Sequence, residues 1–181
     1  MDDMILSRDF NGENVRLLYD PQDILVEADK GRMTQVFSNL LSNAVQFTKH
    51  GSITITSEAR DGQLIVCIKD TGPGMHPEIL SRLFTKFATK SITGSTGLGL
   101  FISKSIIEAH GGRIWAENNK GDIIGNSTGA TFVFNLPIRD RKMKKIISDT
   151  WLILRKSLKN TCGFDLLSDW KSKNHTVLLT K

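Results

Sequence analysis

Residues 35–48 read QVFSNLLSNAVQFT and lie in a predicted helix that has Asp29 as its N-cap and runs to about Phe47. The apolar residues of this segment recur in steps of three and four, which is typical of a helix with one buried face. The members of this stripe are Met33, Val36, Phe37, Leu40, Leu41, Ala44 and Val45. We therefore expect a long amphipathic helix that packs against a second layer of the fold.

Strand patterns surround this helix. Alternating or apolar runs predict strands over residues 14–19, 52–58, 64–68, 113–117 and 130–136. A proline predicts the start of a short helix over residues 77–87, and a third helix is predicted over residues 97–109, where a His-Gly-Gly sequence then ends it. Because strand pairs are interleaved with helices, the order predicts an α+β fold, a two-layer sandwich, rather than a doubly wound βαβ fold.

Two glycine-containing segments carry signs of a binding site. DTGPGM, residues 70–75, has the composition of a turn, but Asp70 can also accept a hydrogen bond from an exocyclic amine such as that of adenine. GSTGLGL, residues 94–100, opens a helix, where free N–H groups and the helix dipole bind anions; alternatively, its glycines serve only close packing. It is not a P-loop, since no Gly-Lys-Ser/Thr follows, and its spacing does not match a dinucleotide-binding fingerprint.

Asn39 and Asn43 lie four residues apart and share one face of the first helix, a pattern more typical of a solvated surface. Alternatively, an amide oxygen can bind Mg²⁺, which prefers oxygen ligands and takes several from phosphates and water. Along the chain, Asn43 and Asp70 are 27 residues apart, as are Asp70 and Gly97. One ligand accounts for all of these features, with adenine at Asp70, phosphates at Gly97 and Gly99, and Mg²⁺ between the phosphates and Asn43.

Taken as a set, these motifs resemble the catalytic and ATP-binding domain of sensor histidine kinases. Residues 35–48 resemble the N box, DTGPGM the G1 box, LFTKFATKS (residues 83–91) the F box and the start of the ATP lid, and STGLGLFISKSIIEAHGGRIWAEN (residues 95–118) the G2 box with the helix and strand that follow. The resemblance covers about residues 14–137. It implies the GHKL (Bergerat) fold, a mixed sheet backed by three helices, with ATP held on the helical side.

The resemblance also implies an activity and a site. The γ-phosphate of ATP would pass to a histidine on a separate helical dimerisation domain, and then to an aspartate of a response regulator. Asn43 would bind Mg²⁺, Asp70 the adenine amine, and Phe84 and Phe87 would brace the lid. The full ATP site implied by the resemblance comprises Asn39, Asn43, Phe47, Asp70, Gly72, Gly74, Met75, Phe87, Lys90, Thr96, Gly97, Leu98, Gly99 and Leu100.

The chain departs from the family's pattern at several positions. Gln46 and Phe47 stand where Lys and Tyr are frequent. Thr89 stands where an Arg is common, with Lys90 as the nearest cation, and Ser95 replaces a frequent glycine. These departures alter contacts of the lid and the phosphates and leave the core set of site residues in place.

Asn39 favours a kinase over a hydrolase. Type II topoisomerases, MutL-type proteins and the anti-sigma serine kinases carry a Glu one helical turn before the magnesium-binding Asn, where this chain has Asn39. An amide cannot accept a proton at neutral pH, so rapid ATP hydrolysis is disfavoured and the γ-phosphate remains for an imidazole nucleophile. None of the chain's 4 histidines is followed by the Glu or Asp typical of a phospho-acceptor. We therefore expect a protein histidine kinase domain that acts on a histidine outside this chain.

Composition limits the remaining choices. The 181 residues are 39% hydrophobic and 24% charged, as in a folded globular domain. No apolar run reaches the roughly 18 residues of a membrane span, and the first residues do not resemble a signal peptide. The two cysteines, Cys67 and Cys162, do not form a disulfide framework. We expect a cytoplasmic location, or the cytoplasmic part of a membrane-attached sensor.

Charge divides the chain into a body and a basic tail. Residues 138–181 carry 11 Lys or Arg and 4 Asp or Glu, against 13 and 15 in the preceding residues. The shift predicts a lead-in over residues 1–13, a catalytic domain over 14–137 and a tail over 138–181, and the body shows no basic stripe for nucleic acid. The tail's helical stripe consists of Met143, Ile147, Trp151, Leu154 and Leu158. This pattern is typical of a helix packed on its own domain, or of one that docks on a partner or an anionic membrane.

A nucleotide-binding module or protein kinase that acts on a partner through this tail is the alternative to a histidine kinase.

Overall fold

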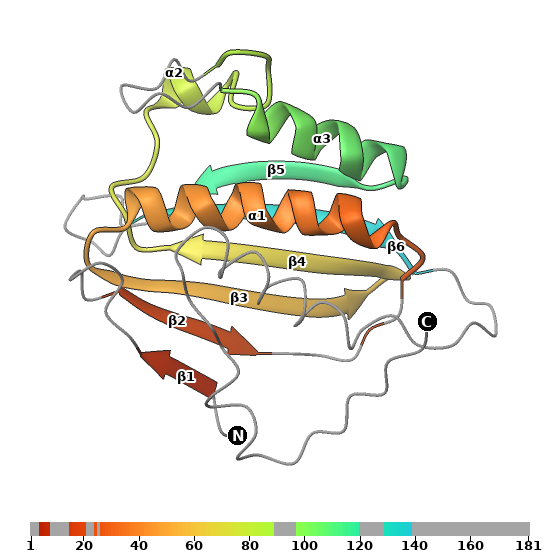
Figure 1. Ribbon diagram of the computed structural model, residues 1–181, viewed down its shortest axis with the longest axis horizontal. Coiled ribbons are helices and arrows are strands. Elements are labelled where there is room, and N and C mark those ends of the chain that lie inside the picture. The colour runs from red at the N-terminus through yellow and green to blue at the C-terminus, as the bar shows by residue number, and fades with distance from the viewer. Residues whose placement is uncertain are drawn as a thin grey trace.

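A six-stranded mixed sheet forms one layer of the molecule, and the helices lie over one of its faces (Figure 1). The computed structural model describes residues 4–7, 15–20, 24, 26–88, 97–119 and 129–138. The strands are β1 (Met4–Ser7), β2 (Val15–Asp20), β3 (Gly51–Arg60), β4 (Gln63–Asp70), β5 (Arg113–Asn118) and β6 (Ala130–Pro137). The helices are α1 (Lys30–Phe47), α2 (Pro77–Leu80) and α3 (Gly99–Ala109). The predicted α+β two-layer sandwich with a mixed sheet is confirmed.

Helix α1 begins where the sequence predicts. The Asp29 side chain accepts a hydrogen bond from the backbone N–H of Arg32 at 2.8 Å, the N-cap contact that satisfies a free donor of the first turn. His110 at the end of α3 reaches the same place, because its Nε2 accepts a hydrogen bond from the Asp29 N–H at 3.1 Å while its Nδ1 donates to the Ile106 carbonyl at 2.7 Å. The His110 imidazole therefore links the start of α1 to the end of α3.

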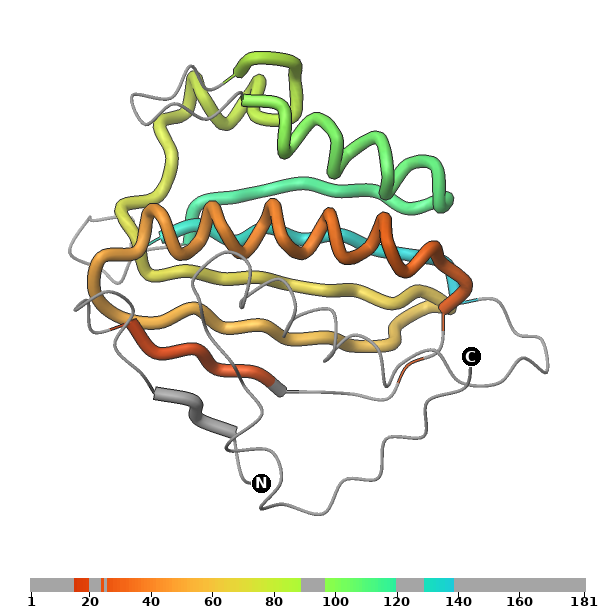
Figure 2. Tube along the Cα trace, viewed as in Figure 1, coloured from red at the N-terminus to blue at the C-terminus, as the bar shows by residue number. Residues whose placement is uncertain are grey.

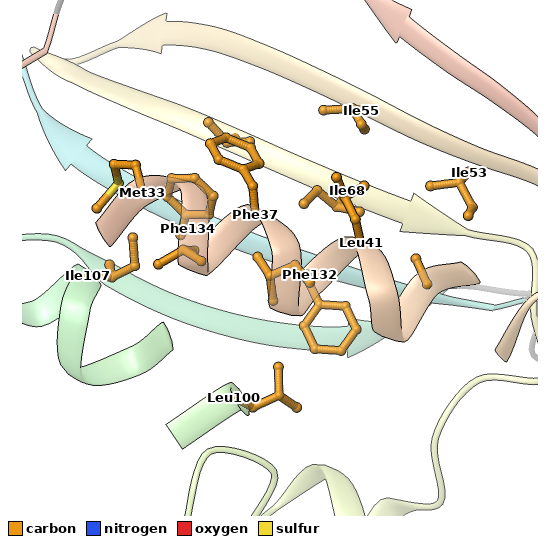
Figure 3. Close-up of a cluster of buried hydrophobic side chains, with 14 of the residues drawn as sticks. Met33, Phe37, Leu41, Ile53, Ile55, Ile68, Leu100, Ile107, Phe132 and Phe134 are labelled. Atoms are coloured by element: carbon orange, nitrogen blue, oxygen red, sulfur yellow. The ribbon is translucent and has the colours of Figure 1, made fainter. Parts of the chain in front are cut away.

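The core lies between α1, α3 and the covered face of the sheet (Figure 3). Along β3, β4 and β6 alternate side chains point towards α1, as the period of two in a strand requires. The rings of Phe37 and Phe134 pack edge to face, with centroids 5.6 Å apart. All predicted members of the α1 stripe are buried except Val45, which is partly buried against the same core.

Strand order decides which ends of the elements meet. β2 runs parallel to β3, and α1 is the crossover that a parallel pair requires. β6 lies between β4 and β5 and is antiparallel to both. The C-terminal ends of α1, β4 and β5 therefore lie on the same side as the N-terminal ends of α3 and β6, on the left in Figures 1 and 2.

Two predicted helix boundaries are wrong. Helix α2 ends at Leu80 rather than near Phe87, because from Arg82 onward the backbone N–H hydrogen bonds reach carbonyls three residues back, as from Thr85 to Arg82 at 2.9 Å. Helix α3 begins at Gly99 rather than Gly97, because Gly97 has a φ of +64°, outside the helical region.

The first strand was not predicted. β1 lies within the segment expected to be a lead-in and pairs antiparallel with β2. The predicted tail stripe lies outside the described residues. Within the described ranges, no helix combines the length and the hydrophobicity that crossing a bilayer would take.

Candidate nucleotide-binding site

Asp70 stands at the end of β4, with a side chain that is only 4% exposed. Its Oδ1 accepts hydrogen bonds from the backbone N–H groups of Gly72 at 2.9 Å and of Ala130 at 3.2 Å. These two donors come from the loop after β4 and from the start of β6, so they fix the plane of the carboxylate. The second oxygen, Oδ2, receives no hydrogen bond from any described residue and is therefore available to a donor on a ligand.

Burial raises the pKa of the Asp70 carboxyl, and the hydrogen bonds from Gly72 and Ala130 act in the opposite direction. The two N–H groups thus favour the charged form of a group that burial penalises. When ionised, the carboxylate only accepts hydrogen bonds, so Oδ2 can bind a ligand that presents a hydrogen-bond donor.

The loop after β4 lies close to the end of α1. A Cβ on Gly72 would lie 2.8 Å from the Phe47 carbonyl oxygen and 3.0 Å from Asp70 Oδ1, so only glycine permits this approach. Gly74 has a φ of +76°, and Met75 packs partly buried against the core. Phe47, whose carbonyl contacts this loop, is 55% exposed at the end of α1. The structure therefore brings the predicted residues Phe47, Asp70 and Gly72 together.

Asn39 joins α1 to the first turn of α3. Its Nδ2 donates to the Gly99 carbonyl at 3.0 Å and to Ser103 Oγ at 3.2 Å, and Ser103 Oγ donates to the same carbonyl at 2.9 Å. A Cβ on Gly99 would lie 3.3 Å from the Asn39 amide, so the two helices are in close contact here. This contact holds the N-terminus of α3, the predicted phosphate site, against α1.

Asn43 lies half-buried one turn after Asn39 on α1. No group of three or more His, Cys, Asp or Glu side chains among the described residues could hold a metal ion. The Asn43 amide oxygen could supply one ligand to a cation, with phosphate oxygens and water as the others. This set of hard oxygen ligands suits Mg²⁺, which keeps several waters and shares phosphates in many nucleotide sites.

The remaining predicted residues divide into three groups. Gly97 and Leu98 lie directly before α3, and Leu100 is buried in the core rather than directed to a ligand. Phe87 is 62% exposed, and no described contact joins it to the rest of the predicted site. Lys90 and Thr96 lie outside the described residues, as do Thr89 and Ser95.

Two asparagine side chains that touch the candidate site were not predicted from the sequence. Asn118 bonds to the backbone of Met75, and Asn119 donates to the Asp70 carbonyl. The only available signal was a pair of amides after a predicted strand. Nothing in the spacing links that pair to residues more than 40 positions earlier.

Residues 28–140 match the family model of the histidine kinase-, DNA gyrase B-, and HSP90-like ATPases. The chain belongs to this ATPase family. Among curated relatives, the sensor protein FixL of Bradyrhizobium diazoefficiens is 42% identical over 134 residues, which cover 71% of this chain and 25% of FixL. The sensor protein SrrB of Staphylococcus aureus is 43% identical over 116 residues, which cover 60% of this chain and 19% of SrrB. The chain thus spans a quarter or less of these two relatives.

Solved structures agree with the family match. The catalytic domain of the histidine kinase ThkA in a nucleotide-free form is 39% identical, with a TM-score of 0.57, over 66% of this chain and 74% of ThkA's. Full-length ShkA, solved in complex with AMPPNP, is 26% identical with a TM-score of 0.59, over 76% of this chain and 32% of that one. These matches confirm the predicted resemblance: this member of the ATPase family is the catalytic, ATP-binding domain of a sensor histidine kinase.

Proposed function

We propose that this domain, over residues 14–137, transfers the γ-phosphate of ATP to a histidine on a separate dimerisation domain. One observation carries the proposal: a buried, oriented carboxylate at Asp70 ends β4, on the side of the molecule where α3 begins and where Asn39 contacts Gly99. The first feature suits a base with an exocyclic amine, and the second suits phosphates at a helix N-terminus. ATP carries both groups.

Each part of the site would contribute one function. Asp70 Oδ2 would accept the adenine amine, while Gly72 and Met75 would line the ring. The free N–H groups at the start of α3, at Gly97 and Gly99, would bind phosphate oxygens. Asn43 would supply one ligand to Mg²⁺, which, when bound, neutralises charge on the phosphates during transfer.

Asn39 supports transfer to an acceptor side chain over hydrolysis. Its amide nitrogen is engaged by Gly99 and Ser103, and an amide is not a base, so nothing at this position activates a water molecule. The imidazole nitrogen of the acceptor would form the new P–N bond as the bond from the γ-phosphorus to the bridging oxygen breaks, with ADP leaving. The phosphoryl group would then pass from the imidazole to an aspartate carboxylate of a response regulator.

The partners follow from the same chemistry. ThkA has been solved in complex with the response regulator TrrA. The ThkA chain in that complex is 36% identical to this chain, with a TM-score of 0.54, over 70% of this chain and 34% of ThkA's. This supports a response regulator as the final acceptor here. A cytoplasmic location, where ATP and such regulators occur, is part of the proposal.

Phosphotransfer with separate components tests the proposal. The chain is incubated with radiolabelled ATP and a panel of purified histidine-bearing dimerisation domains, and acid-labile label on these domains is measured. Asn43→Asp and Asp70→Asn are expected to abolish transfer, while Asp61→Asn, the same substitution on an exposed turn, is expected to retain it. Transfer that survives both site substitutions would refute the site assignment. ATP binding without transfer to any domain would favour the alternative, a nucleotide-binding module that acts on another partner.

A further inference from the structure

Two consecutive asparagines at the end of β5 hold both ends of the loop that follows β4. Asn118 is bonded twice to Met75: its Oδ1 accepts from the Met75 N–H at 2.7 Å, and its Nδ2 donates to the Met75 carbonyl at 2.7 Å. Asn119 Nδ2 donates to the Asp70 carbonyl at 2.8 Å. The loop from Asp70 to Met75 is therefore held at its first and its last residue by neighbouring positions of one strand end.

Asn119 is itself held in place. Thr131 Oγ1 donates to Asn119 Oδ1 at 2.6 Å, and the Asn119 N–H donates to the Gly129 carbonyl at 2.9 Å. A Cβ on Gly129 would lie 1.9 Å from the Asp70 carbonyl oxygen, so the start of β6 closes tightly over the same peptide. The amide of Asn119 is thus part of the end of the sheet, and its orientation is not free.

The loop itself has little regular structure to set its shape. Its backbone hydrogen bonds among the described residues are those of Thr71 to Ser52 and of Gly72 to the Asp70 side chain. Beyond Gly72, the next backbone hydrogen bonds of the loop are the two that join the Met75 N–H and carbonyl to the Asn118 side chain. An amide side chain presents a donor and an acceptor side by side, which matches the N–H and C=O of one residue as a neighbouring strand would.

We propose that Asn118 and Asn119 are positioning residues for the adenine base, an inference that rests on the proposed function. They fix the separation between Asp70, which would accept the adenine amine, and Met75, which would line the ring. Neither asparagine needs to touch the nucleotide. Their effect is to hold both ends of the Asp70–Met75 loop in place before the ligand arrives, which lowers the ordering cost of binding.

Nucleotide affinity in matched variants tests this inference. Asn118→Ala removes two hydrogen bonds at the site end of the β5–β6 pair. Asn135→Ala removes two at the opposite end of the same pair, where Asn135 accepts from the Arg113 N–H and donates to Gln63. The dissociation constants for ATP and GTP are measured by calorimetry with Mg²⁺ present, and thermal unfolding is recorded for each variant.

We expect Asn118→Ala to weaken ATP binding roughly tenfold, the scale of one or two lost hydrogen bonds, and to narrow the preference for ATP over GTP. Asn135→Ala is expected to lower the melting temperature by a similar amount and to leave both dissociation constants unchanged. Asn118→Gln keeps the amide but moves it by one methylene group. A smaller loss in the same direction is expected from this variant, which makes the test independent of how the alanine variant folds.

Three results would overturn the inference. The first is equal ATP affinity in Asn118→Ala and Asn135→Ala. The second is a loss for ATP and GTP by the same factor in both Asn118 variants, since this would indicate general destabilisation rather than a displaced base pocket. The third is a wild-type chain that binds no ATP, which would overturn the proposed function itself and this inference with it.

Discussion

Replacing Asp70 with asparagine separates the part of this carboxylate in nucleotide binding from its part in folding. An asparagine has nearly the same shape, and its amide oxygen can keep the hydrogen bonds from Gly72 and Ala130 that Oδ1 now accepts. The amide NH₂ then takes the place of Oδ2. At that position the chain would present a donor to the adenine amine, which is also a donor.

The expected loss follows from this exchange. A hydrogen bond to a charged group contributes about 1.5–3 kcal/mol, and each 1.4 kcal/mol corresponds to a factor of about ten in affinity. Asp70→Asn should therefore weaken ATP binding by roughly 10- to 150-fold. Isothermal titration calorimetry with Mg-ATP measures this loss, and Asp61→Asn on the exposed β3–β4 turn is the matched control.

Asp70→Asn weakens nucleotide binding but is not expected to lower the stability of the fold at neutral pH. Because burial raises the pKa of Asp70 above its ordinary value of 3.8, the folded state binds the proton more tightly than the unfolded state. The stability of the wild-type chain should then fall as pH rises from 3.8 through the raised pKa, and the loss should persist at neutral pH. Asparagine does not ionise, so this part of the pH dependence should be absent from the variant, which is expected to be at least as stable as the wild type at neutral pH.

Two measurements would contradict this reasoning. Unchanged ATP affinity in Asp70→Asn would show that the carboxylate does not meet the base. A variant that is much less stable than the wild type at neutral pH would show that the charge of Asp70, rather than the geometry of its acceptor, holds the end of β4.

The remaining predictions concern the scaffold. Gly129→Ala should destabilise the fold strongly, because the new methyl group would lie 1.9 Å from the Asp70 carbonyl oxygen. Gly62 also has a positive φ, but a Cβ there meets no atom within 4 Å, so Gly62→Ala is the control. A similar loss of melting temperature in both variants would contradict the steric reason. Asp29→Ala should lower the free energy of unfolding by about 1 kcal/mol through the lost N-cap, measured by urea denaturation, with unchanged ATP affinity. Burial raises the pKa of the Cys67 thiol above its ordinary value of 9.0. In a Cys162→Ser variant, the rate at which folded Cys67 reacts with a thiol reagent should therefore keep rising above pH 9.0. In the urea-unfolded chain, the same rate should level off near pH 9.0.

Local patterns were sufficient for much of the fold. The cap at Asp29 and the apolar stripe of α1 depend only on residues within one or two helical turns, so periodicity and capping predicted them correctly. The prediction failed where the backbone changes conformation within a turn. Helix α2 stops at Leu80 through a series of short turns, and α3 starts only after the left-handed Gly97.

The sequence by itself determined the layers and the main elements, and it predicted the residues of the candidate site. Asp70, Asn39 and the glycines around them were recognisable because their residue types and spacing form a set that resembles a known family. Only the tertiary structure decided how this set is supported. The placement of β6 between β4 and β5 brings Ala130 and Asn119 to Asp70, across 60 and 49 positions of the chain. Strand pairing depends on packing between distant segments, and no pattern within a single element records it.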